Sequence, residues 1–235
     1  MDTVVPAPAP PASNLEEVIA RLRAIDAVLP ASDGVACFNR MYLEVTVEVS
    51  RRIEQGAFGD PGFMAHLDVV FANLYFRAVD ALSGPPGKVP QAWRALLEAR
   101  SVRGIEPIQF ALAGMNAHIN HDLPIAVVAA CKDLRTAPVA GSHHADYLVV
   151  NALLAASEQA VRESFEPPEL VVVDKHVAAV ANVIANWSIE AARGVAWDTA
   201  LALWEVRGFE IAVGLLTGAL ARTVAMASRG LLVVV

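Results

Sequence analysis

Hydrophobic and polar positions follow a helical period along the chain from residue 15 onward. Apolar residues recur at every third or fourth position, and the breaks between these runs contain residues that cap or end helices. The pattern predicts helices at about residues 15–29, 33–55, 61–82, 91–103, 107–134, 143–165, 170–192 and 197–228. No clear run alternates with the period of two that is typical of a half-buried strand. We therefore expect an all-α protein, a single-domain bundle of seven or eight helices.

Single residues at the predicted helix boundaries refine this pattern. Ser32 is expected to cap the second helix, and Gly194 is expected to separate the last two. Pro124 lies inside the central helix, where it removes an amide donor and should produce a kink.

The first 13 residues differ from the rest of the chain. They are rich in Pro and Ala, and they contain neither the basic region nor the apolar segment of a signal peptide. We therefore expect a disordered arm over residues 1–13, a single helical domain over residues 14–235, and a cytoplasmic protein.

The composition is unusually apolar, with 55% hydrophobic and 18% charged residues. No uncharged apolar run reaches the ~18–20 residues that a bilayer span needs, so we expect no transmembrane segment. A large core with a buried pocket, or a homo-oligomer interface, would account for the composition instead. The net charge of −7 and the lack of a basic stripe argue against a nucleic-acid partner.

The densest group of polar residues lies in the middle of the central helix. Two histidines, two asparagines and an aspartate occur between Asn116 and Asp122, with apolar sequence on both sides. A buried polar group without a partner costs roughly 1–3 kcal/mol, so these side chains should be paired or used. His118 and Asp122 are four residues apart and should share one helix face.

The pair of His118 and Asp122 permits two kinds of chemistry. It can supply two ligands to a divalent metal, or the carboxylate can orient the histidine for acid–base catalysis. Asp68 lies in an apolar helical stripe and is expected to join them, as is Asp146 from the helix that begins at His143. Three alternatives stay open. The polar cluster only ties helices together, the stripe that carries Asp68 faces outward, or Asp68 meets an arginine such as Arg77 or Arg94.

Other polar residues are expected to surround or support this site. Asn116 and Asn120 form a second pair four residues apart, which we interpret as structural. The remaining supporting candidates, which lie on the same or neighbouring helices, are His121, His144, Tyr75 and Asn151. Farther along the chain, the spacing of Glu190 and Arg193 suggests an ion pair.

A different grouping is also open. His66, the doublet His121-Asp122 and Asp146 follow the order of the His, His-Asp and Asp signature of the all-α metal-dependent phosphohydrolases. The upstream spacing of 55 residues is wide for that signature.

The central block also resembles a known family. Phe110 to Asn120, followed by Asp122-Leu123-Pro124, resembles the Met-Asn-Ala-His-Ile-Asn-x-Asp-Leu-Pro signature of a bacterial all-helical family known only as a domain of unknown function. The resemblance extends over about residues 15–228. It implies that Asp68, His118, Asp122 and Asp146 belong together and that position 121 need not be histidine, and it transfers no reaction.

These observations favour an enzyme with a His/Asp site inside the bundle. One form is a hydrolase with one divalent metal (zinc, manganese or iron) that acts on a small, lipid-like or specialised-metabolite substrate. The alternatives are a metal-free acid–base cyclase or lyase and a non-catalytic ligand-binding or oligomerisation module. The residues expected to line a pocket are Met64, Phe71, Tyr75, Met115 and Trp187.

Overall fold

The chain folds as an all-α bundle, as the hydrophobic pattern predicts. The computed structural model describes residues 5–84, 88–152, 154 and 188–234. All regular secondary structure within these residues is helical, and they contain no strand. The N-terminal half of the bundle consists of α1 (Leu15–Val28), α2 (Gly34–Glu54), α3 (Pro61–Asp80) and a short 3₁₀ turn, η1 (Ala81–Ser83).

Side-chain caps begin the first three helices. The side chains of Asn14, Asp33 and Asp60 accept hydrogen bonds from backbone N–H groups in the first turns of α1, α2 and α3. The cap of α2 is therefore Asp33 rather than the expected Ser32. Asp33 also forms a buried ion pair with Arg100, at 2.6 Å between Nη2 and Oδ2, which fixes it at this position.

The central helix is interrupted where the polar residues are densest. It consists of α5 (Pro107–Ala117), a π-helical turn η2 (His118–Asp122) and α6 (Leu123–Asp133), and the short α4 (Arg94–Ala99) precedes it. Pro124 cannot donate to the carbonyl of Asn120, and its ring would clash with that carbonyl in a regular α-helix. The expected disturbance therefore appears as a widened turn immediately before Pro124, a feature that often marks functional sites.

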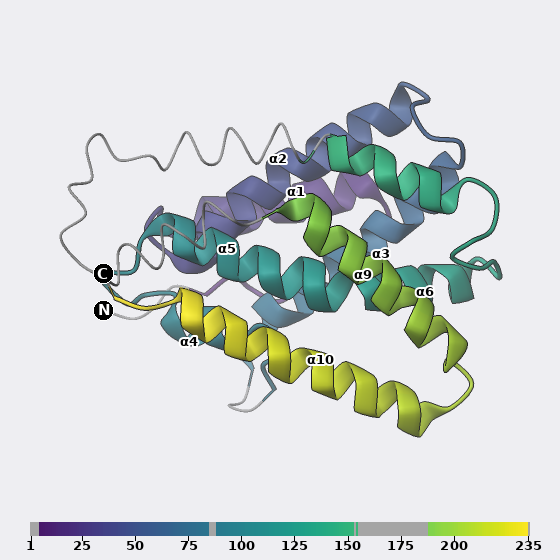
Figure 1. Cartoon of the computed structure of the whole chain (residues 1–235). Coiled ribbons are helices and arrows are strands. Elements are labelled where there is room, and N and C mark those ends of the chain that lie inside the picture. The colour runs from purple at the N-terminus through teal and green to yellow at the C-terminus, as the bar shows by residue number, and fades with distance from the viewer. Residues whose placement is uncertain (1–4, 85–87, 153, 155–187, 235) are drawn as a thin grey trace.

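The helix α5 lies in the middle of the bundle (Figure 1). It packs against α2 on one side and α10 (Glu210–Leu231) on another, whereas α6 packs against α3 and α9 (Ile189–Glu205). The close approach of α2 and α5 depends on Gly114, because an added Cβ would lie 2.4 Å from the ring of Phe38.

The C-terminal helices differ from the prediction in their boundary. Gly194 lies inside α9, and the break between α9 and α10 falls at residues 206–209. A single glycine costs a helix only about 1 kcal/mol, so the packing of α9 tolerates it. The helix that begins at His143 is described through residue 152 and again at 154, and the predicted helix at 170–192 lies almost entirely outside the described residues.

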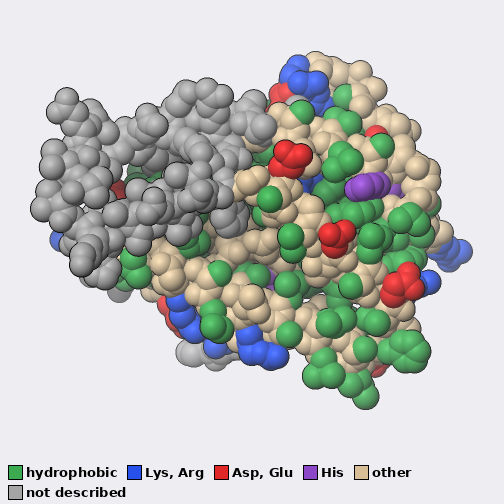
Figure 2. Space-filling view, in the orientation of Figure 1, with side chains coloured by type: hydrophobic (Ala, Val, Ile, Leu, Met, Phe, Trp, Pro, Cys, Tyr) green, Lys and Arg blue, Asp and Glu red, His purple; other side chains and the backbone are tan. Residues whose placement is uncertain are grey.

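The N-terminal half of α10 and the turn before it carry exposed apolar side chains, including Phe209, Ile211 and Leu215. Figure 2 shows hydrophobic side chains gathered at the lower right, where Figure 1 places this part of α10. The helix is long and apolar enough, by length and composition alone, to cross a membrane. We expected no such segment because charged residues interrupt every apolar run in the sequence, but α10 continues for nine residues beyond one of them, Arg222. Core helices of soluble proteins can meet the same criterion, and α10 is only 22% buried in its most apolar window.

Residues 5–13, for which composition predicts disorder, form no helix and contact the bundle. The backbone of Ala12 forms two hydrogen bonds of 2.8 Å with the side chain of Asn73 in α3. The guanidinium of Arg21 donates to the carbonyls of Ala9 and Pro10, and Ser83 donates to that of Pro6.

Candidate functional site

A largely apolar cavity lies between α2, α3, the central helix, the helix from His143 and α9. Its volume, counted as the space open to the centres of water-sized molecules, is about 90 Å³. One water needs roughly 10–15 Å³ on the same measure, so the cavity can hold a small molecule. Its described lining is mostly aliphatic and aromatic, and it includes the expected residues Met64, Phe71 and Met115. The polar side chains in the lining are Tyr42, Asp68, His118, Tyr147 and Arg193.

His118 enters this cavity from the π-helical turn and is only 2% exposed. Its imidazole stacks on Phe71, with ring centroids 3.5 Å apart and planes 6° from parallel. Tyr42 packs against it edge-on at 4.6 Å, and Phe38 does so at 5.6 Å. The ring is therefore fixed in one orientation by aromatic packing from α2 and α3.

Asp122 holds the Nδ1 side of the same imidazole. Its Oδ2 lies 3.1 Å from Nδ1 of His118 and accepts a hydrogen bond of 2.8 Å from Nε1 of Trp93. Its Oδ1 lies 2.7 Å from Nδ1 of His121. Burial alone would raise the pKa of Asp122, but the hydrogen bonds from the two histidines outweigh it and place the pKa below its usual value.

An ionised Asp122 determines the tautomer of His118. The carboxylate can only accept, so the imidazole proton lies on Nδ1 and the lone pair lies on Nε2. Burial lowers the pKa of His118 more than Asp122 raises it, so the ring is neutral near pH 7. Nε2 is buried and has no hydrogen-bond partner among the described residues. It is therefore a basic atom whose lone pair receives no hydrogen bond from these residues.

Asp68 supplies a second unpartnered polar atom to the same cavity. Its Oδ2 is buried without a hydrogen-bond partner among the described residues, and the same is true of the hydroxyl of Tyr42. Burial raises the pKa of Asp68 to about 7, although the positive charge of Arg193 acts in the opposite direction. A carboxyl group with this pKa is partly protonated at neutral pH and can donate or accept a proton.

The structure brings together three of the four predicted catalytic or metal-binding residues. Asp68 and His118 both line the cavity, and Asp122 lies directly behind His118. Asp146 does not line the cavity but accepts hydrogen bonds of 2.8 Å from the N–H groups of Gly59 and Asp60.

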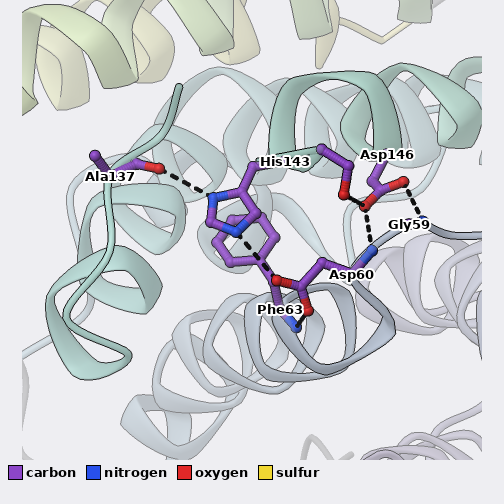
Figure 3. A network of polar contacts seen from close by, with 7 residues as sticks. Gly59, Asp60, Phe63, Ala137, His143 and Asp146 are labelled. Carbon is purple, nitrogen blue, oxygen red and sulfur yellow. Dashed lines mark hydrogen bonds and ion pairs between the residues drawn. The ribbon is translucent and has the colours of Figure 1, made fainter. Parts of the chain in front are cut away.

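Asp146 belongs to a separate polar network at the start of the helix from His143 (Figure 3). It also accepts a hydrogen bond of 2.7 Å from Ser142. In the same network His143 stacks on Phe63 at 3.7 Å, and its ring nitrogens lie 3.0 Å from the carbonyl of Ala137 and 3.3 Å from Oδ2 of Asp60. These contacts connect the loop before α3 to the helix from His143.

The two asparagines beside His118 tie the central helix to α10. Nδ2 of Asn116 donates to the carbonyl of Val224 at 3.0 Å and to the hydroxyl of Ser228 at 2.9 Å. Nδ2 of Asn120 donates to Oδ1 of Asn116 at 2.9 Å. This arrangement agrees with the structural interpretation of the pair.

The remaining supporting candidates lie at different places. Tyr75 donates to Asn39 at 3.2 Å and lies behind His118 rather than in the cavity lining. His144 stacks on Trp197 at 4.6 Å, and Asn151 accepts a hydrogen bond of 2.6 Å from Nε of Arg193. Trp187 lies outside the described residues.

Three residues of the site carry little signal in the sequence. Trp93 and Tyr42 read as ordinary core aromatics, and Arg193 reads as the ion-pair partner of the nearby Glu190. Their roles appear only in the fold. The indole N–H of Trp93 reaches Asp122 from a distant segment, and the side chains of Tyr42 and Arg193 line the cavity.

The expected donor sets for a metal are not assembled in the part of the chain that the structure describes. These residues contain no group of three or more His, Cys, Asp or Glu side chains that could hold an ion. Both oxygens of Asp122 already accept hydrogen bonds, and Asp146 lies in the other network. His66, the upstream residue of the phosphohydrolase grouping, pairs with Asp133 at 3.1 Å on the surface.

Comparison with known proteins gives a family but no activity. No curated protein matches the chain, and no solved structure matches it. The sequence profile described as "Family of unknown function (DUF5995)" matches residues 15–234. That range includes the whole of the cavity lining, the His118–Asp122 pair and the signature block around it. The chain therefore belongs to the DUF5995 family of unknown function.

Proposed function

We propose that this protein is an enzyme that binds a small, largely apolar molecule in the cavity and transfers a proton between that molecule and His118. One observation carries the proposal: Nε2 of His118 is buried without a partner among the described residues, while Nδ1 is held by Asp122. A structural histidine at this depth would be expected to have partners at both nitrogens. The reaction class is isomerisation, elimination or cyclisation without a metal.

His118 acts as the general base in this scheme. Nε2 accepts a proton from a C–H or O–H bond of the substrate, and the electron pair of that bond stays on the substrate. The imidazolium that forms is stabilised by the carboxylate of Asp122, which keeps its own charge. Hydrogen bonds from Trp93 and His121 hold that carboxylate in place.

Asp68 acts as the complementary acid. Its protonated form donates a proton to the oxygen or carbon on which the negative charge develops, and the pKa of about 7 suits this role near neutral pH. The hydroxyl of Tyr42 can donate a hydrogen bond to the same developing charge without losing its proton, because burial raises its pKa well above the usual value.

The proposal is tested by measuring which compounds the protein converts, because binding alone would not distinguish an enzyme from a binding module. The purified protein and its His118→Gln variant are incubated with a small-molecule extract of the source cells, and the masses that disappear or appear are measured. Conversion by the native protein and its loss in His118→Gln are expected. His143→Gln is the matched control, because His143 is also a buried histidine but does not line the cavity.

Two results would contradict the proposal. Compounds that are retained but unchanged would favour a binding module. Conversion that requires stoichiometric zinc, manganese or iron, measured by metal analysis of the untagged protein, would favour the metal-dependent hydrolase that the sequence suggested.

A further inference from the structure

Arg193 is a buried cation whose position the sequence did not anticipate. The spacing to Glu190 suggests an ion pair, but Glu190 is exposed and forms no ion pair with Arg193 in the described structure. Arg193 is instead 5% exposed and turns toward the cavity. Its Nε donates to Oδ1 of Asn151 at 2.6 Å, and its Nη2 donates to the carbonyl of Tyr147 at 2.8 Å.

These contacts fix the guanidinium without neutralising it. The ring of Tyr147 lies 4.0 Å from the guanidinium carbon, and its hydroxyl donates to the backbone carbonyl of Arg193 at 2.8 Å. All of these partners are neutral, and Nη1 has no hydrogen-bond partner among the described residues. An arginine stays charged in a protein, and a buried charge is normally paired with an opposite one.

The acidic residue that faces Arg193 does not fill this role. Asp68 lines the same cavity and interacts with Arg193 electrostatically, but no ion pair joins them. Asp68 is also partly protonated near pH 7, so it offers only part of a negative charge. The cavity therefore contains a fixed cation in a mostly apolar lining, and one of its donor nitrogens, Nη1, has no partner among the described residues.

We propose that Arg193 binds the carboxylate of the substrate, so that the molecule on which His118 acts is a small, apolar carboxylic acid. This inference rests on the proposed function, because it uses the same cavity. A carboxylate is the ligand that best matches a planar, positively charged guanidinium. The aliphatic and aromatic lining suits a hydrocarbon chain or a single ring as the rest of the molecule.

Matched pairs of small ligands test the head group directly. Hexanoate and phenylpropanoate are compared with hexanol and phenylpropanol, and with hexylamine, by calorimetry or ligand-observed NMR on the full chain. A charge-assisted hydrogen bond contributes about 1.5–3 kcal/mol, so each acid should bind roughly ten- to a hundredfold more tightly than its alcohol. Hexylamine should not bind.

Variants then assign the preference to one residue. Arg193→Gln should remove the preference for the acids and leave the affinity for the alcohols within a fewfold. Arg207→Gln is the matched control, because Arg207 also lies 4.0 Å from an aromatic ring, that of Trp204, but on the surface. If Arg193→Gln does not fold, the comparison of acid with alcohol on the native protein still decides the question.

The outcomes separate this inference from the proposed function. Acid binding that is lost in Arg193→Gln but kept in His118→Gln supports the anchor, even if no conversion is ever found. Equal affinity for acid and alcohol, an undiminished acid affinity in Arg193→Gln, or no binding of either acid in the millimolar range would overturn it.

Discussion

Two buried histidine–carboxylate networks lie in the part of the chain that the structure describes, and they differ in one respect. Around His143 and Asp146, both imidazole nitrogens and both carboxylate oxygens have partners. Around His118 and Asp122, both carboxylate oxygens have partners, but Nε2 of the histidine has none among the described residues. The first network connects two parts of the fold, and the second presents a basic atom to a cavity. The comparison shows that composition alone does not identify a site, because the two networks contain similar groups.

Exchange of each histidine for glutamine should separate the networks most strongly. His118→Gln is expected to reduce conversion of the substrate by about 10²–10⁴-fold, the usual contribution of a general base. It should also lower the free energy of unfolding by about 1–3 kcal/mol, because the exchange removes the Nδ1 contact with the buried Asp122 carboxylate and the stack on Phe71. His143→Gln should keep activity and lower the stability by about 1 kcal/mol for lost hydrogen bonds. Steady-state kinetics and urea unfolding measure both, and a reversed pattern would exchange the two roles.

The pKa of Asp68 gives the next largest effect, and it depends on pH. The pKa is raised to about 7 in the folded protein from a model value of 3.8, so the native state binds the proton more tightly than the unfolded state. The contribution of Asp68 to the free energy of unfolding is therefore fully present below about pH 4, and this contribution is lost as the pH rises through 7. Asp68→Asn should remove a penalty of up to about 4 kcal/mol above pH 7.

Urea unfolding of the native protein and Asp68→Asn at pH 5 and at pH 8 measures this difference. The variant should gain more stability over the native protein at the higher pH. An equal gain at both pH values would mean that the carboxyl group is already ionised in the fold.

Removal of Asp146 tests the structural network. Asp146→Ala leaves the N–H groups of Gly59 and Asp60 and the hydroxyl of Ser142 without their acceptor. We expect a loss of about 2–3 kcal/mol in the free energy of unfolding, with little change in the affinity for a cavity ligand. Ser142→Ala removes one of the three bonds and should cost about 1 kcal/mol. A larger effect of Asp146→Ala on ligand affinity than on stability would place this residue in the site.

The smallest expected effect concerns packing behind His118. An added methyl at Gly114 would displace the ring of Phe38, which packs edge-on against His118. Gly114→Ala should therefore destabilise the protein by about 1–3 kcal/mol and weaken ligand binding. Gly214→Ala in α10 is the control, because nothing lies within 4 Å of the added carbon and a better helix former should stabilise by up to about 1 kcal/mol. Equal changes in melting temperature would argue that Phe38 moves freely.

The order and type of the described helices follow from the sequence because they depend on local patterns. Apolar spacing defines helical faces, and the capping residues Asn14 and Asp60 begin two of the helices at the predicted positions. The pair of His118 and Asp122 is also local, since residues four apart meet on any helix. Gly194 shows the limit of this reasoning, because packing along α9 overrides the weak preference of one glycine.

The composition of the site was decided by tertiary structure. Hydrogen bonding from Trp93 to Asp122, the inward turn of Arg193 and the separation of Asp146 from the cavity all depend on contacts between distant segments. The sequence places both Asp68 and Asp146 among the candidate site residues. In the fold, Oδ2 of Asp68 has no hydrogen-bond partner among the described residues, whereas Asp146 accepts hydrogen bonds from three donors. The sequence alone thus determined which residues are polar in an apolar environment. Only the fold decided which of them remain unsatisfied, because hydrogen bonds are completed by groups that the chain brings together from far apart.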